Sequence, residues 1–226
     1  MPNYWQNAKR VLLAQGNIGC RGLRSYNKYL GINLLKQVTR AYSEWERRGR
    51  PGGVFRILEI GAGEGVVAKK IDSLLKKRNA AFEIIPLNLS VEDFNGTRVG
   101  SAVTADCLSL PFRNDSINFV ISVGTAPYIR DRPWLLREVN RVLSPIGGEA
   151  HVNLFRHSQK ETDLVYEEDG PKPLAKWLGR RGFKTRKHSV SFQKMKETPL
   201  PTAVSISTVF HRGVPLPKVN YVSLHR

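Results

Sequence analysis

Three glycines at alternate positions carry the clearest chemical signal in the chain. Residues 54–60 have the apolar, β-branched character of a buried strand, and Gly61, Gly63 and Gly65 follow directly. Residues without a side chain let the backbone approach a ligand closely and adopt turns that other residues avoid. A helix predicted over 64–78 would then present its first N–H groups to an anionic group. The sequence therefore predicts a ligand site at the bend between a strand and a helix.

The spacing of these glycines separates this bend from the dinucleotide-binding fingerprint. That fingerprint places its third glycine one residue later, where this chain has Val66. The chain also has an acidic residue, Glu59, two positions before the first glycine. This combination is more specific than a glycine turn alone.

The elements that must position the bend alternate along the chain. Further strands are expected over 82–89, 102–105, 117–123 and 149–155, with helices over 133–143 and 173–181. Such alternation predicts an α/β fold with a parallel sheet and helices on both faces. Two closing strands, 183–192 and 203–210, have no helix between them, which predicts a hairpin that adds a C-terminal antiparallel strand. Before the bend, apolar residues four apart predict one helix over 26–48.

Four segments, in this order, resemble motifs of class I S-adenosylmethionine-dependent methyltransferases of the type 11 group. They are RILEIGAGEG (56–65), TADCLSLPF (104–112), the fourth strand (117–123) and LREVNRVLSPIGG (136–148). The resemblance covers about residues 55–155. It implies a Rossmann-like fold with a seven-stranded, mostly parallel sheet, and S-adenosylmethionine as the cofactor. The expected organisation is a basic arm and helix (1–50), a methyltransferase domain (51–212) and an extended tail (213–226).

The resemblance also assigns roles by position. Gly61, Ala62, Gly63 and Gly65 would line the methionine end of the cofactor, and Glu59 would support that turn. Asp106 would accept a hydrogen bond from the adenine amino group beside the backbone of Cys107. Val123, with Gly124, would lie under the sulfonium. A turn-forming role for Asp106 is the alternative.

The chain departs from the family pattern at the end of the second strand. Asn88 stands where the family carries an acidic residue that holds both ribose hydroxyls. An amide can bond a hydroxyl but lacks the strength of a charged acceptor. Pro86, Asn118 and Ile146 are further departures. Together they raise a second hypothesis, a methyltransferase-like subunit without catalytic activity.

The residues that would act on the methyl acceptor are less defined, because the cofactor itself supplies the reactive methyl group. Tyr128 is the best candidate, since it follows the fourth strand, and a packed aromatic is its alternative reading. The sequence does not match the motifs of amino-directed or ribose-directed enzymes, and neither Cys20 nor Cys107 is placed as a nucleophile. His151 and His157 flank the fifth strand as a candidate general base or, more simply, as surface residues. No metal-ligand cluster is visible in the sequence.

Charge is concentrated at the two ends of the chain. The net charge is +17, with +8 in residues 1–50, −2 in 51–170 and +11 in 171–226. Basic ends around a neutral middle favour contact with RNA or a ribonucleoprotein, and a small-molecule acceptor is the alternative. No apolar stretch is long enough to span a membrane, and the oligomeric state is left open. An intracellular, cytoplasmic protein is expected, although the acid-free residues 1–43 also resemble an organellar (mitochondrial) transit segment.

Overall fold

The computed structural model describes residues 22–94, 100–129, 131–154, 162–167, 170–186, 189–196 and 205–209. For 92–93, 128, 162–167, 170–172 and 205–209 it describes the backbone alone. The arm before residue 22, the predicted tail over 213–226, Cys20 and His157 lie outside these ranges.

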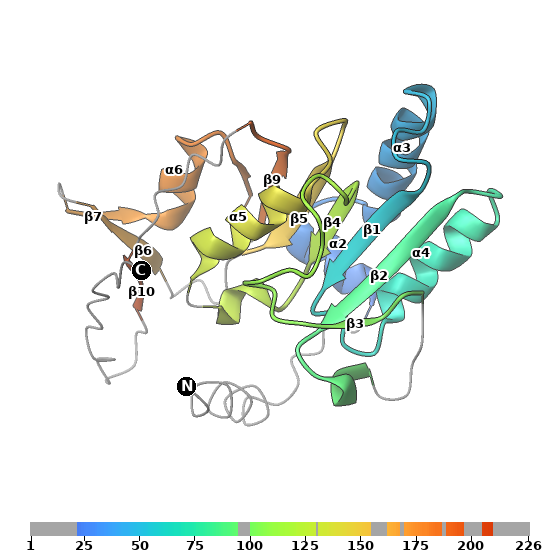
Figure 1. The fold of residues 1–226 in the computed structure, drawn as a ribbon. Coiled ribbons are helices and arrows are strands. Elements are labelled where there is room, and N and C mark those ends of the chain that lie inside the picture. The colour runs from blue at the N-terminus through green and yellow to red at the C-terminus, as the bar shows by residue number, and fades with distance from the viewer. Residues whose placement is uncertain are drawn as a thin grey trace.

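A seven-stranded sheet forms the centre of the molecule, in the order β3-β2-β1-β4-β5-β9-β8. The strands in that order are Val103–Thr104, Phe82–Asn88, Phe55–Ile60, Phe119–Ser122, Glu149–Asn153, Ser189–Gln193 and Lys184–Thr185. The first five are parallel to one another, and β9 runs antiparallel to β5 (Figure 1). The predicted Rossmann-like, mostly parallel sheet with a C-terminal antiparallel strand is therefore confirmed.

Helices cover both faces of this sheet. They are α2 (Leu23–Leu30), α3 (Leu34–Arg47), α4 (Val66–Lys76), α5 (Arg132–Val142) and α6 (Leu174–Gly179), with 3-10 turns η1 (Val91–Phe94) and η2 (Ala126–Tyr128). In the described ranges, none of the helices is both long and apolar enough to cross a bilayer.

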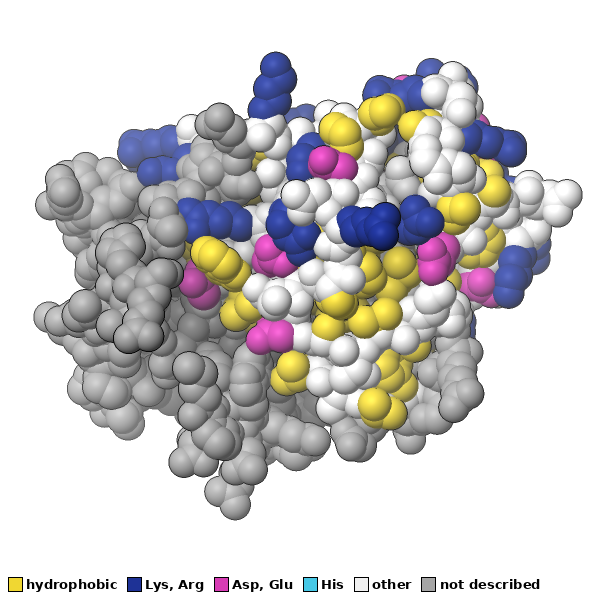
Figure 2. Space-filling model, viewed as in Figure 1, with side chains coloured by type: hydrophobic (Ala, Val, Ile, Leu, Met, Phe, Trp, Pro, Cys, Tyr) yellow, Lys and Arg dark blue, Asp and Glu magenta, His cyan; other side chains and the backbone are white. Residues whose placement is uncertain are grey.

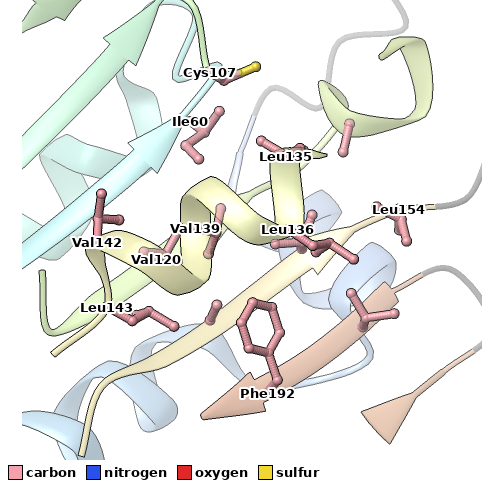
Figure 3. Close-up of a cluster of buried hydrophobic side chains, with 14 of the residues drawn as sticks. Ile60, Cys107, Val120, Leu135, Leu136, Val139, Val142, Leu143, Leu154 and Phe192 are labelled. Atoms are coloured by element: carbon pink, nitrogen blue, oxygen red, sulfur yellow. The ribbon is translucent and has the colours of Figure 1, made fainter. Parts of the chain in front are cut away.

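Two apolar clusters hold the layers together, one on each face. Leu135, Leu136 and Val139 of α5 pack on Ile60 and Val120 of the sheet (Figure 3). The other cluster joins α2, α3 and α4 to the opposite face of β1, β2 and β4. The central parallel strands β1, β2 and β4 are thus covered on both sides, which explains their near-continuous apolar runs in the sequence.

The single helix predicted over 26–48 is wrong in one respect, because two helices cover that region. Gly31 ends α2 in the left-handed conformation, with φ 67°. Asn33 then starts α3 by accepting a hydrogen bond from the Lys36 N–H. The four-residue apolar spacing survives the break, so periodicity alone did not reveal it.

The predicted closing strands also differ from the structure. Residues 183–192 form two strands, β8 and β9, that pair with each other. The strand predicted over 203–210 exists as β10 (Ser205–Val209), but it lies outside the main sheet. It pairs with β6 (Thr162–Glu167), which also pairs with β7 (Gly170–Pro173), in a separate three-stranded sheet. Neither β6 nor β7 was predicted.

Candidate cofactor site

The glycine bend joins the end of β1 to α4 through three left-handed residues. Gly61, Gly63 and Gly65 have φ values of 72°, 54° and 67°. L-residues other than glycine rarely adopt this conformation. Gly65 is also the N-cap of α4 and provides no side-chain cap. The predicted turn is therefore present where the sequence placed it.

Backbone hydrogen bonds tie this bend to the neighbouring strand β2. The carbonyl of Leu87 accepts from the N–H groups of Gly61 at 2.7 Å and Ala62 at 3.2 Å. The N–H of Gly65 donates to the Ala62 carbonyl at 3.0 Å, which closes the turn on itself. The bend is consequently fixed before any ligand arrives, and these three donors are already used.

Asn88 contacts the same bend with its side chain. Its Oδ1 accepts from the Gly63 N–H at 2.8 Å, and its Nδ2 donates to the Gly63 carbonyl at 2.9 Å. The residue is 4% exposed. Asn88 therefore reaches the predicted site, but its observed partner is the protein backbone.

The two outer faces of the bend differ in their surroundings. A Cβ on Gly61 would lie 1.7 Å from Oγ1 of Thr125, whereas a Cβ on Gly63 would meet nothing within 4 Å. Thr125 follows β4 and thus covers the Gly61 side. The Gly63 side is the open one, and a ligand can approach the backbone there. Sequence reasoning missed Thr125, although its place just after the fourth strand was a usable signal.

Glu59 lies beneath the bend as a fully buried carboxyl. Tyr26 of α2 donates its hydroxyl to Glu59 Oε1 at 2.6 Å, while Oε2 has no hydrogen-bond partner among the described residues. Burial raises the pKa of Glu59 to about 7, and the bond from Tyr26 opposes that rise. Glu59 therefore links the bend to the N-terminal helix. The sequence placed Tyr26 on an apolar helix face and gave no sign of this contact.

The predicted adenine loop follows β3 and is a tight turn. Asp106 Oδ1 accepts from the Leu108 N–H at 2.8 Å, so the turn-forming role weighed for Asp106 is present. Burial, with the nearby charge of Asp106, raises the pKa of the Cys107 thiol to about 12. A thiol that stays protonated is a poor nucleophile, which agrees with the expectation that Cys107 is not a nucleophile.

The remaining predicted residues lie just after β4. Val123 is 3% exposed and packs in the cluster beneath α2, α3 and α4. Gly124 donates its N–H to Asn153 Oδ1 at 3.2 Å and so joins the ends of β4 and β5. The backbone of Tyr128 closes η2, and its side chain lies outside the described part of the structure.

His151 is not the surface residue that the sequence suggested. It is 7% exposed and both ring nitrogens are engaged, Nδ1 with Ser191 Oγ at 2.8 Å and Nε2 with Glu149 Oε1 at 3.1 Å. Arg40 of α3 forms an ion pair with the same Glu149. Burial is the largest single effect on the pKa of Glu149 and raises it. The hydrogen bonds and charges of His151 and Arg40 together outweigh burial, so the pKa is lowered. These contacts join α3, β5 and β9, which is a structural role. No group of metal-ligating side chains occurs among the described residues.

An S-adenosyl nucleoside has a methionine end, a ribose and an adenine. The residues around the bend fit the methionine end and the adenine. The open side of Gly63 can admit the methionine end, and the Asp106 turn follows β3, beyond β2 in the sheet, where adenine would be held. The ribose position fits less well, since Asn88 carries no charge and both of its side-chain polar atoms already bond Gly63. When bound, such a cofactor would supply an electrophilic methyl group.

Comparison with known proteins gives one family match and several similar solved structures. Residues 58–149 match a family model described as a methyltransferase domain, of type 11. No curated protein matches the chain. A solved structure of an S-adenosylmethionine-dependent methyltransferase from Mesorhizobium loti is similar, with 26% identity and a TM-score of 0.36, over 49% of this chain and 52% of that one. A candidate S-adenosyl-L-methionine-dependent methyltransferase from Methanococcus maripaludis has 18% identity and a TM-score of 0.37, over 54% of this chain and 60% of that one.

This chain thus spans between about half and three fifths of the length of these two solved proteins. The family match carries the assignment, because it covers the glycine bend, β2, the adenine loop, β4 and α5 together. S-Adenosylmethionine is the cofactor that the family implies. Residues 58–149 match the family model of a type 11 methyltransferase domain, and this is the S-adenosylmethionine-dependent family that the sequence motifs resemble.

Proposed function

We propose that this protein is an active S-adenosylmethionine-dependent methyltransferase whose acceptor is RNA or a ribonucleoprotein. One observation favours the RNA substrate: the fold places described parts of both basic ends of the chain along one edge of the sheet. The glycine bend and its open Gly63 side support the methyl-transfer part of the proposal.

Two contacts connect segments that are far apart in the sequence. Arg186 donates through Nη1 to the Gly31 carbonyl at 2.6 Å. Ser189 donates through Oγ to the Leu30 carbonyl at 2.9 Å. The end of α2 therefore lies against the turn between β8 and β9, with α6 next to β8.

The surface at this edge is cationic. We call it the basic edge and define it by the exposed side chains Arg24 and Lys28 of α2, Lys176 of α6, and Arg180, Lys184 and Arg186. Residues 22–43 and 170–196 contain no Asp or Glu. Lys and Arg side chains also lie across the face seen in Figure 2, with fewer acidic ones among them. A group of cationic side chains carried by two acid-free segments suits a phosphate backbone.

An RNA partner fits this edge better than a membrane surface does. Peripheral membrane segments combine basic residues with exposed apolar ones that enter the lipid. The exposed large apolar side chains of the described residues are Leu89, Val91, Trp134 and Ile146, and none belongs to the basic edge.

Cofactor binding is tested by calorimetry with S-adenosylmethionine. We expect a micromolar dissociation constant, and we expect Gly63→Arg to abolish the binding by filling the open side of the bend. No detectable heat at millimolar cofactor would instead favour the second candidate function, a methyltransferase-like assembly subunit. That alternative is favoured by Asn88, which lacks the charge of the usual ribose ligand.

The RNA preference is tested by the salt dependence of binding to a mixed-sequence single-stranded RNA oligonucleotide. A triple variant, Lys28→Glu, Arg180→Glu and Lys184→Glu, changes the basic edge. The matched control, Lys70→Glu, Lys77→Glu and Arg78→Glu, makes the same change in net charge at exposed positions in and just after α4. That helix lies beside β2, which three strands separate from β9.

We expect the edge variant to reduce the slope of log affinity against log salt by about 2, for three lost phosphate contacts at about 0.7 each. The control should leave the slope close to that of the unchanged protein. Equal effects of the two variants, or methylation of small acceptors with no salt-dependent RNA binding, would show that the RNA preference is wrong.

A further inference from the structure

The Asn88 side chain forms a reciprocal pair with a single residue of the glycine bend. The Gly63 N–H can only donate and the Gly63 carbonyl can only accept. The amide must therefore face them with Oδ1 on the N–H and Nδ2 on the carbonyl, as observed at 2.8 and 2.9 Å. A flipped amide would place donor against donor, so this pair fixes the orientation of the side chain.

These two bonds act on the two peptide groups that flank the Cα of Gly63. They hold its left-handed conformation, with φ 54°, and keep its open side facing outward. A carboxylate at position 88 could accept from the N–H, but it would set a negative oxygen against the Gly63 carbonyl. An amide is therefore the group that this pairing requires, and Asn88 is more than a weakened form of the acidic residue.

We propose that Asn88 is a positioning residue that holds Gly63 in its ligand-ready conformation, in place of binding the ribose hydroxyls of the cofactor. This inference rests on the proposed methyltransferase function. The ribose hydroxyls then receive no bond from position 88, and recognition falls on the backbone of the bend and on the adenine loop.

The chain contains a matched control for this pairing. Asn140 of α5 is also 4% exposed. Its Oδ1 accepts from the Met195 N–H at 2.9 Å, and its Nδ2 donates to the Met195 carbonyl at 3.2 Å. This pair joins α5 to the end of β9 and does not touch the glycine bend. Asn140→Asp thus produces the same chemical conflict without changing the bend.

The first experiment compares Asn88→Asp with Asn140→Asp in the full chain. Both variants should lower the melting temperature, because each opposes a carboxylate to a backbone carbonyl. Only Asn88→Asp should weaken the binding of S-adenosylhomocysteine, by about tenfold for one lost hydrogen bond. A ribose-binding role predicts the opposite sign, since a carboxylate accepts from both hydroxyls and tightens binding; that result would overturn the proposal.

The second experiment is a double-mutant cycle between Asn88→Ala and the ribose hydroxyls. Affinities for S-adenosylhomocysteine and its 2′,3′-dideoxy analogue are measured for the unchanged protein and the variant. A positioning role predicts that Asn88→Ala weakens both ligands by the same factor, with a coupling ratio near one. A ratio above about threefold, beyond the scatter expected of independent sites, assigns a direct ribose contact to Asn88 and refutes the proposal.

Hydrogen exchange separates failure of this inference from failure of the proposed function. If no S-adenosyl ligand binds, the methyltransferase proposal fails, and the pairing is still measurable in the free protein. The Gly63 amide should exchange slowly in the unchanged chain and much faster in Asn88→Ala, whereas the Gly61 amide, bonded to Leu87, should change less. Equal exchange of Gly63 in both proteins would overturn the positioning role.

Discussion

The buried carboxyl of Glu59 makes a quantitative prediction about pH and stability. Its pKa rises from 4.5 to about 7 in the folded chain. An acid with a raised pKa binds its proton more tightly when folded, so its ionisation destabilises the protein as pH rises from the unfolded to the folded pKa. The full cost above the folded pKa is about 3 kcal/mol, at 1.36 kcal/mol for each pKa unit.

Glu59→Gln removes this titration and keeps an oxygen that can accept from the Tyr26 hydroxyl. Between about pH 5 and about pH 8, the unchanged protein should lose about 2.5 kcal/mol of unfolding free energy relative to the variant. The unpaired amide of the variant imposes a cost that does not vary with pH, so it cancels from this difference. All other titrating groups are common to the two proteins and cancel as well.

Urea unfolding at the two pH values measures the difference directly. Glu64→Gln removes one exposed carboxyl from the same bend and controls for the change in net charge. Parallel pH profiles for Glu59→Gln and the unchanged protein, within about 0.5 kcal/mol, would refute the raised pKa of Glu59 in the folded chain.

Two further predictions concern the bend and the network beneath α3. Gly61→Ala should lower the free energy of unfolding by about 2 to 3 kcal/mol, because its Cβ would overlap Thr125 and its φ is 72°. Gly63→Ala places its Cβ in open space, so it should lower the free energy of unfolding by only about 1 to 2 kcal/mol, through left-handed strain. Gly63→Ala should nevertheless impair cofactor binding more than Gly61→Ala does. Urea unfolding and calorimetry measure the two effects, and equal stability losses would contradict the role given to Thr125. Arg40→Ala should cost about 1 kcal/mol near neutral pH, a value reduced because Arg40 is 53% exposed. The pKa of Glu149 is lowered, so this stabilisation exists above the unfolded pKa and disappears as pH falls through the folded one. The stability loss caused by Arg40→Ala should therefore become smaller in acid. Arg47→Ala, which breaks a surface pair, is the control. A stability loss for Arg40→Ala that stays constant down to low pH would exclude the ion pair with Glu149 as its source.

Much of the fold follows from local sequence signals. The glycine bend was predictable because left-handed φ is a property of single residues, and Gly61, Gly63 and Gly65 all adopt it. The central parallel strands β1 and β4 were predictable because they are largely apolar on both faces. The C-terminal region was not, because β10 pairs with β6 across a long sequence separation, and the local β6–β7 hairpin belongs to that same separate sheet. Similar short runs can join either sheet, and only the packed structure selects between them.

The sequence by itself determined the strand-and-helix order, the bend, the family motifs and the excess of charge at the two ends. The tertiary structure alone decided which residues come into contact across the fold. These pairs are Asn88 with Gly63, Tyr26 with Glu59, Thr125 with Gly61, and Arg186 with Gly31. Backbone preference and apolar periodicity act over a few residues, so they are written in the local sequence. A hydrogen bond between buried groups depends on the placement of whole elements to within a fraction of an ångström, and that placement is fixed only when the layers pack.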